Sequence, residues 1–249
     1  MAGHSKWANI KHKKGRADAA RGKVFSKIAK EIIVAASAGG GNLDDNIQLR
    51  ALVQKAKGVS MPKDNIDRAI KKGTGELAGG ALEEMVYEAY ASGGVPVIVE
   101  ALTDNKNRAA SEIKNVLTKN GASLAAQGAI SRLFQRKGQI LISADATDEE
   151  TLMDLVLEAG AEDMQREGDQ FEVLTAFGDY AAVANAVSDA GIETESSELT
   201  MLPDMPTNIA DKEQAQKLMR LVDLLEELDD VQNVYPGFEI DDSIVDELD

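Results

Sequence analysis

Cationic side chains are concentrated near the start of the sequence. Residues 3–30 contain nine Lys or Arg and a single acid. Lysine and arginine neutralise phosphate groups and release condensed counterions, which is the usual basis of nucleic-acid binding. We therefore predict that this stretch contacts nucleic acid, through Lys6, Lys11, His12, Lys13, Lys14, Arg16, Arg21, Lys23, Lys27 and Lys30.

One aromatic residue lies within the same basic stretch. Trp7 is the only tryptophan of the chain. Its indole could stack on an exposed base, as aromatic side chains do when proteins bind single-stranded RNA. It could equally pack against the helical part that follows. The sequence leaves both interpretations open, and we include Trp7 among the candidate nucleic-acid contacts.

The charge of the chain is divided between two parts of opposite sign. Residues 1–72 carry 16 Lys and Arg against 6 Asp and Glu, whereas residues 73–249 carry 11 against 37, for a formal net charge of −16 overall. A basic part attracts a polyanion, and an acidic part keeps the protein soluble and repels non-specific nucleic-acid contact. An ordinary solvated charged face is the alternative, but segregation by sign favours a nucleic-acid footprint.

A second polar group is predicted where a strand meets a helix. Residues 104–108 read DNKNR. The free N–H groups of a helix start, together with Lys106 and Arg108, could bind a phosphate. Alternatively, Asp104 or Asn105 simply caps the helix. We keep both interpretations and add Lys106 and Arg108 to the candidate contacts.

Few side chains of this sequence suit catalysis or metal binding. The chain has no cysteine, and its two histidines, His4 and His12, both precede the first expected fold element. A serine nucleophile would therefore lack a histidine base in the folded part. The glycines form neither a phosphate-binding loop nor a dinucleotide-binding turn. We expect no enzymatic activity, no metal, no cofactor and no small-molecule substrate.

Apolar spacing predicts three helices in the first part of the chain. They run from residue 17 to the glycines at 39–41, over 44–57, and from 60 to 73. On a helical wheel, Arg16, Lys23, Lys27 and Lys30 fall within about 60° of arc, opposite the apolar side. We expect the apolar side to pack and this cationic stripe to remain solvent-exposed.

The pattern changes after residue 80 to strands alternating with helices. We expect strands at 85–90, 95–102 and 129–135, a helix at 107–119, then a βαββαβ unit over 139–202, and finally a helix at 211–227 and a strand at 231–235. The βαββαβ order is the ferredoxin-like signature. The preceding hairpin, helix and strand lack a second covering helix, which the segment after 203 supplies.

These elements predict an α+β protein with one domain inserted in another. The expected parts are a basic arm and helical domain (1–76), the first part of an α/β domain (77–136), an inserted ferredoxin-like domain (137–202) and the second part of the α/β domain (203–249). No apolar run approaches the roughly 20 residues needed to cross a bilayer, so we expect no membrane association.

Several stretches of this sequence are similar to one known family. They are MAGHSKWANIKHKKGRADAARGKVFSKIAKEI, AGGGN, MPKDNIDRAIKKG, YEAYASGGVPVIVEALTDNKNR, GAISRLFQRKG, EAGAED and KLMRLVDLLEELDDVQNVY. In this order they resemble the YebC/PmpR family of probable transcriptional regulators over essentially the whole chain. The resemblance implies an N-terminal three-helix domain and two ferredoxin-like α/β domains, the third inserted in the second.

The resemblance also implies a function without enzymatic activity. Some family members are described as DNA-binding regulators, whereas others act on the ribosome and help synthesis through proline-rich stretches. We expect a DNA-binding regulator of gene expression, with a ribosome- or rRNA-binding translation factor as the alternative. No secretory signal or organellar presequence precedes MAGHSKW, so a bacterial cytoplasmic location is expected.

Overall fold

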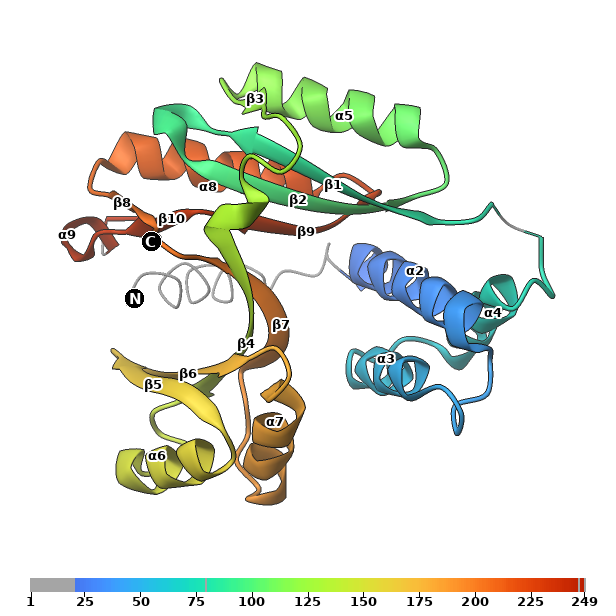
Figure 1. Cartoon of the computed structure of the whole chain (residues 1–249), viewed down its shortest axis with the longest axis horizontal. Coiled ribbons are helices and arrows are strands. Elements are labelled where there is room, and N and C mark those ends of the chain that lie inside the picture. Colours follow the sequence, from blue (N-terminus) through green and yellow to red (C-terminus); the bar gives the residue numbers. More distant parts are fainter. Residues whose placement is uncertain (1–20, 79, 246, 249) are drawn as a thin grey trace.

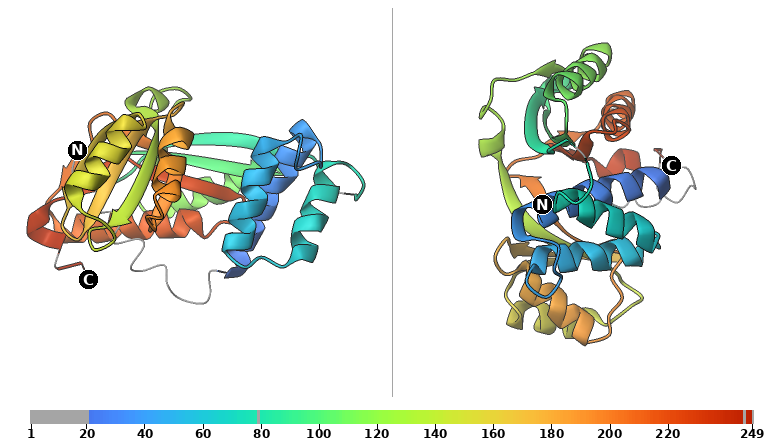
Figure 2. Two further views of the ribbon diagram at one scale, coloured as in Figure 1. Left: turned by 90° about the horizontal axis from the view of Figure 1, so that it is seen from below. Right: turned by 90° about the vertical axis from the view of Figure 1, so that its right-hand side faces the viewer.

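A computed structural model of the chain describes residues 21–78, 80–245, 247 and 248. A helical domain lies at one end, and two antiparallel sheets with their helices form the rest (Figure 1). The view from below also places the helical domain at one end of the molecule (Figure 2, left). The fold is therefore α+β, with the three-part architecture that the sequence predicts.

The helical domain packs two short helices against a longer one. Its elements are α2 (Arg21–Gly39), α3 (Ile47–Gly58) and α4 (Lys63–Gly73). Ile28, Ile32 and Ala36 recur every four residues on α2 and are buried in the core. Gly73 lets α4 approach closely, because a Cβ there would lie 2.4 Å from the Ile33 carbonyl oxygen.

A buried asparagine connects the end of α2 to the start of α3. The side chain of Asn46 accepts a hydrogen bond from the backbone N–H of Leu49 and so caps α3. Its amide nitrogen donates to the carbonyl oxygens of Ala35 and Gly40. Gly40 has a φ of +81°, a conformation that glycine adopts without steric cost. The glycine run therefore ends α2 and turns the chain into α3.

The first sheet carries both of its main helices on one face. Its strand order is β3-β1-β2-β9. The elements are β1 (Glu83–Tyr90), β2 (Pro96–Thr103), α5 (Lys106–Lys119), β3 (Ser123–Leu124), α8 (Lys212–Glu226) and β9 (Val231–Pro236). Val97, Val99 and Ala101 alternate along β2 toward this face and pack with Ile113 of α5 and Leu218 of α8.

Three small elements extend this domain near the C-terminal end. They are β8 (Thr207–Ile209), β10 (Phe238–Ile240) and α9 (Asp242–Val245). β8 and β10 form a parallel pair, and the fully buried Phe238 joins the core of the first sheet. Each of these elements is too short to show a periodic pattern, so apolar spacing does not predict them.

The second sheet is the βαββαβ unit that the sequence predicts. Its elements are β4 (Phe134–Ser143), α6 (Glu149–Glu158), β5 (Ala161–Glu167), β6 (Gln170–Ala176), α7 (Tyr180–Asp189) and β7 (Ser196–Pro203). The strand order is β5-β6-β4-β7, and all pairs are antiparallel. Leu152 of α6 and Val183 of α7 pack on Ile140 and Val173 of the sheet. The inserted ferredoxin-like domain is thus confirmed.

The prediction of a strand at 129–135 is wrong for residues 129–133, and only its last two residues lie in a strand. Residues Ser131–Leu133 form a 3-10 turn, and β4 then runs without interruption from Phe134 to Ser143, through the predicted boundary at 136/137. The buried carboxylate of Glu88 holds this turn, accepting hydrogen bonds from the backbone N–H groups of Gly128, Ile130 and Ser131 and from the Ser131 hydroxyl. A contact between residues about 40 apart therefore replaces the strand.

No helix in the described part of the chain has the length and apolar composition needed to cross a bilayer.

Candidate nucleic-acid interface and interdomain junction

The predicted contact residues fall into three groups in the structure. Seven lie outside the described residues: Lys6, Trp7, Lys11, His12, Lys13, Lys14 and Arg16. Arg21 is the first residue of α2. The remaining five are Lys23, Lys27 and Lys30 on α2 and Lys106 and Arg108 at the start of α5. The structure shows what surrounds these five side chains.

The α2 lysines lie against the first sheet's domain. The Lys23 ammonium donates to the carbonyl oxygen of Glu227 at 2.8 Å, and that of Lys27 to the carbonyl oxygen of Gln232 at 3.1 Å. Lys30 is only 19% exposed at its side chain. The expectation of a solvent-exposed stripe is therefore wrong for Lys27 and Lys30, which are half-buried, while Lys23 stays exposed. The helical wheel predicts that these lysines share one side of α2, but it does not predict that the first sheet's domain covers that side.

Lys30 uses all three of its N–H donors at this junction. Its ammonium lies 2.9 Å from Oδ1 of Asp230, 2.9 Å from the carbonyl oxygen of Leu102 and 2.7 Å from that of Asp229. An ammonium that makes three such bonds is fully satisfied. Lys30 thus fastens α2 to the end of β2 and to the turn between α8 and β9.

Asp230 is the buried centre of this junction, with an exposed fraction of 3%. Its carboxylate also accepts from Arg108, with Nη2 at 2.8 Å and Nε at 3.1 Å from Oδ2, and from the Thr103 hydroxyl at 3.0 Å. Burial alone raises the pKa of a carboxyl group. Here the hydrogen bonds from Lys30 and Arg108 outweigh burial and hold the pKa of Asp230 below its usual value. Asp230 therefore remains ionised.

The start of α5 combines capping with ion pairing. Asn105 caps the helix, because its side chain accepts a hydrogen bond from the Arg108 backbone N–H at 3.1 Å. Asp104 instead pairs with the Arg108 guanidinium at 2.9 Å, and Lys106 pairs with Glu83 at 2.6 Å. The capping alternative is thus confirmed for Asn105. Both cations of this turn are engaged with carboxylates in this arrangement.

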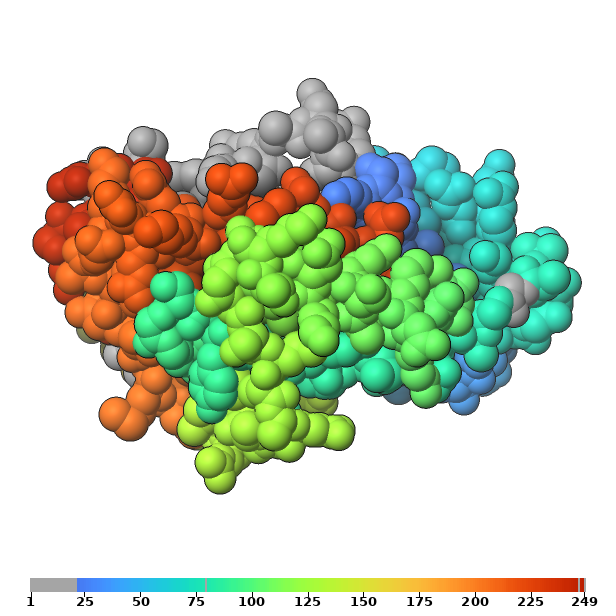
Figure 3. Space-filling view, turned by 90° about the horizontal axis from the view of Figure 1, so that it is seen from above, coloured from blue at the N-terminus to red at the C-terminus, as the bar shows by residue number. Residues whose placement is uncertain are grey.

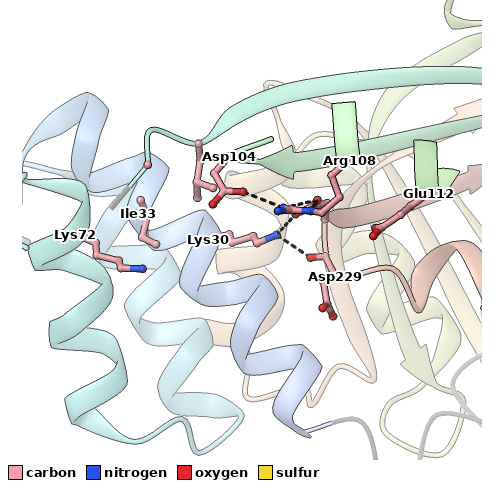
Figure 4. Close-up of a pocket in the computed structure, with 10 residues that line it drawn as sticks. Lys30, Ile33, Lys72, Asp104, Arg108, Glu112 and Asp229 are labelled. Atoms are coloured by element: carbon pink, nitrogen blue, oxygen red, sulfur yellow. Dashed lines mark hydrogen bonds and ion pairs between the residues drawn. The ribbon is translucent and has the colours of Figure 1, made fainter. Parts of the chain in front are cut away.

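A pocket of about 500 Å³ lies between the helical domain and the first sheet's domain. Figure 4 shows Lys30, Arg108 and Asp229 meeting on one side of it, with Lys72 of α4 reaching toward it from the other. Glu112 of α5 also points into it. Carboxylates and cations alternate around this pocket, so its lining does not select an anion. We assign it to the junction between the domains.

The helical domain also presents cations on its outer surface that are not among the predicted contact residues. The exposed side chains are Lys57, Lys63, Arg68 and Lys71. None of the four forms an ion pair with another described residue. Figure 3 shows this domain as a block at one end of the molecule. The net charge of residues 1–72 was the signal that could have found them.

The described residues hold no imidazole or thiol, since both histidines lie in residues 1–20 and the chain has no cysteine. No group of three or more His, Asp or Glu within residues 21–78, 80–245, 247 and 248 is arranged to hold a metal ion.

Two family models together match most of the chain. One, described as the TACO1/YebC protein N-terminal domain, matches residues 5–76. The other, described as the TACO1/YebC second and third domain, matches residues 82–238. The matched ranges cover the helical domain and the two sheets.

Curated relatives and a solved structure agree in length with the chain. A probable transcriptional regulatory protein from Syntrophobacter fumaroxidans is 51% identical over 248 residues, covering 100% of both chains. One of the same name from Desulfatibacillum aliphaticivorans is 53% identical, covering 99% of this chain and 100% of the relative. The crystal structure of a conserved hypothetical protein from Aquifex aeolicus is 47% identical, with a TM-score of 0.85, and covers 96% of this chain and 98% of its own.

Proposed function

Because the chain belongs to the TACO1/YebC family, we propose that it is a non-enzymatic, nucleic-acid-binding regulator of gene expression. The relatives that match its full length carry the name "probable transcriptional regulatory protein". The proposal takes duplex DNA as the ligand and requires neither a cofactor nor a small-molecule substrate. It places the protein in the cytoplasm.

The charge division between the two parts of the chain carries this proposal. Residues 1–72 hold 16 of the 27 Lys and Arg of the chain, and the two sheet domains and their linkers are strongly acidic. A polyanion is attracted to the first part and repelled by the second. The contact surface is therefore assigned to residues 3–16 together with the exposed cations of α3 and α4.

The cations of α2 and α5 that lie at the junction are not assigned to the nucleic-acid contact in this proposal. Lys27, Lys30 and Arg108 are held by oxygens of the first sheet's domain. To bind phosphates, they would have to give up these partners. We therefore assign the first nucleic-acid contact to cations outside the junction.

A structured RNA, such as ribosomal RNA, is the second candidate ligand. Trp7 lies among the cations of residues 3–16. Stacking of an indole on a base requires an unpaired base, which RNA loops present and duplex DNA does not. In this alternative the protein acts on the ribosome and relieves stalling at proline-rich stretches.

The two ligands can be distinguished by fluorescence anisotropy at matched salt concentrations. The full chain is titrated onto duplex DNA and onto a structured ribosomal RNA fragment. The test variant carries Lys63→Ala, Arg68→Ala and Lys71→Ala in the helical domain. The matched control carries Lys114→Ala, Lys119→Ala and Lys217→Ala, three exposed lysines of α5 and α8.

We expect the helical-domain variant to bind more weakly and the control to bind as the wild type does. The dependence of log K on log salt should also become shallower, by about 0.9 for each lost contact to duplex phosphate and about 0.7 for each contact to a single strand. Equal affinities of both variants would remove α4 from the interface. Failure of the wild type to bind either ligand would contradict the proposed function.

A further inference from the structure

Helix α2 has two sides with different partners. Its apolar side packs into the core of the helical domain, where Ile28 and Ile32 are buried. On the opposite side three lysines recur within about two turns, and we call them the α2 stripe: Lys23, Lys27 and Lys30. Seven residues of helix rise about 10 Å. One strand of a DNA duplex carries about three phosphates over that length, so the α2 stripe matches a row of phosphates in charge and in length.

A strongly acidic turn contacts the α2 stripe. It comprises residues 226–230 at the end of α8, which read EELDD, and we call it the acidic turn. The ammonium groups of the stripe donate to the carbonyl oxygens of Glu227, Asp229 and Gln232 and to the carboxylate of Asp230, at 2.7–3.1 Å. Figure 4 shows Lys30 in this position. Phosphate oxygens accept hydrogen bonds from ammonium groups in the same way, so the acidic turn uses donors that nucleic acid could also use.

The two domains that meet at this junction keep separate hydrophobic cores. The buried apolar residues of the helical domain form one cluster and those of the first sheet's domain form another, and no described residue belongs to both. A single stretch of chain, residues 74–82, joins the two domains. The pocket of about 500 Å³ leaves part of the junction unfilled. Moving α2 away from the acidic turn therefore breaks polar contacts and leaves both described cores intact.

Asp230 keeps a counter-charge when α2 moves away. Arg108 belongs to the same domain as Asp230, and its Nη2 and Nε lie 2.8 Å and 3.1 Å from Oδ2. The hydroxyl of Thr103, also in that domain, donates to the same oxygen at 3.0 Å. A buried charge is costly only when it lacks a partner, and Arg108 remains as the partner of Asp230. Lys30 is released with its positive charge and can donate to the oxygens of an anionic ligand.

We propose that the α2 stripe is a second phosphate-binding surface, which the acidic turn occupies in the free protein and which bound nucleic acid releases. The exposed cations of α3 and α4 make the first contact, and they belong to the same domain as the stripe. Phosphates then replace the oxygens of the acidic turn, and the helical domain moves away from the first sheet's domain. The acidic turn is thus an internal competitor of the ligand. This inference rests on the proposed function, because it uses the same nucleic acid.

Distances between two spin labels report this movement directly, because a chain without cysteine can be labelled at chosen positions. The reporter pair is Gln54→Cys on α3 and Gln216→Cys on α8, both at exposed positions. The control pair, Ser111→Cys on α5 with Gln216→Cys, lies within one domain. Pulsed EPR is recorded on the full chain, free and with saturating duplex DNA or the ribosomal RNA fragment. We expect the ligand to produce a new distance in the reporter pair and no change in the control pair.

Neutralising the acidic turn should favour binding. The turn variant carries Glu227→Gln and Asp229→Asn, and neither of these carboxylates forms an ion pair with another described residue. The control carries Asp154→Asn and Glu158→Gln, two exposed acids of α6, and changes the net charge by the same amount. In anisotropy titrations the turn variant should bind nucleic acid several-fold more tightly than the wild type, because less attraction holds α2 in place. The control should bind as the wild type does.

The salt dependence of binding tests the stripe itself. The stripe variant carries Lys23→Gln and Lys27→Gln. The slope of log K against log salt should become shallower by about 0.9 for each lost contact to duplex phosphate and about 0.7 for each contact to a single strand. A control with Lys114→Gln and Lys119→Gln, two exposed lysines of α5, should keep the wild-type slope.

The outcomes separate this inference from the proposed function. Wild-type binding with an unchanged distance in the reporter pair would overturn the inference and leave the proposed function intact. An unchanged salt slope in the stripe variant, or equal affinity of the turn variant and the wild type, would also overturn it. Failure of the wild type to bind either nucleic acid would contradict both proposals.

Discussion

The ammonium nitrogen of Lys30 lies 2.9 Å from a carboxylate oxygen of Asp230, a residue 200 positions later in the chain. Asp230 also accepts hydrogen bonds from Arg108 and Thr103, so one buried carboxylate connects α2, β2, α5 and the turn before β9. The helical domain is thereby fastened to the first sheet's domain by charged groups around a buried carboxylate. Its position relative to the sheets depends on this contact.

Replacement of Lys30 by methionine should weaken this junction. Lys30→Met keeps the length of the side chain but removes three hydrogen bonds to oxygens, so the free energy of unfolding should fall by about 2 kcal/mol. Asp230→Asn should cost more, about 3 kcal/mol, because two cations lose their counter-charge. Urea denaturation measures both. Lys57→Met, at an exposed position of α3, is the matched control and should change stability by less than about 0.5 kcal/mol.

Lowering the pH should reduce the difference in the free energy of unfolding between the wild type and Asp230→Asn. The folded-state pKa of Asp230 lies below its ordinary value of 3.8. Its charge therefore stabilises the fold above that value, and this contribution is lost as the pH falls through the folded-state pKa. Unfolding curves of the two proteins should converge below about pH 4. A constant difference over that range would contradict the role assigned to the carboxylate.

Adding one methyl group at Gly73 should disturb the packing of α4 on α2. A Cβ at this position would lie 2.4 Å from the Ile33 carbonyl oxygen and 2.6 Å from the Ala36 Cβ. Gly73→Ala should therefore destabilise the protein by about 1–3 kcal/mol, despite the better helix propensity of alanine. Gly58→Ala is the control, since nothing lies within 4 Å of a Cβ there. A melting temperature of Gly73→Ala equal to or above that of Gly58→Ala would contradict the close contact.

Glu88 should be needed for the turn that leads into the second sheet. Its carboxylate accepts bonds of 2.7 Å from the Gly128 N–H and 2.7 Å from the Ser131 hydroxyl, besides those from Ile130 and Ser131 N–H groups. In Glu88→Gln, the amide NH₂ group faces N–H and O–H donors and cannot accept hydrogen bonds from them. The free energy of unfolding should therefore fall by about 1–3 kcal/mol. Hydrogen exchange of residues 128–131 should become faster. Glu84→Gln, at an exposed position on the same strand, should leave that exchange unchanged.

Stability should depend on pH through Glu172. Its pKa is about 7 in the folded state and near the ordinary 4.5 when unfolded. The folded chain therefore binds more protons between these values, so stability falls as the pH rises from 4.5 to 7. Glu172→Gln should be more stable than wild type at pH 8, by up to about 3 kcal/mol, and equal to it near pH 4.5. In urea denaturation, Glu158→Gln on α6 should show no such pH-dependent difference in stability from the wild type.

The amino-acid sequence by itself determined the order of the main helices and strands and the division of charge. Apolar spacing along α2 marked Ile28 and Ile32 as core residues, and both are buried. The βαββαβ order identified the inserted domain, because each element buries its apolar side against its neighbours in sequence. Asn105 was recognised as a possible cap because capping depends only on residues three positions apart.

The tertiary structure alone decided what the cations of α2 contact. Helical periodicity shows that Lys23, Lys27 and Lys30 share a side of the helix, but it cannot show that the turn before β9 lies against that side. Likewise, Glu88 became the anchor of a turn about 40 residues away. Such contacts join residues that are distant in the chain, and no local pattern encodes which charged group meets which partner. Packing of the domains sets those pairs, because burial makes an unpaired charge costly.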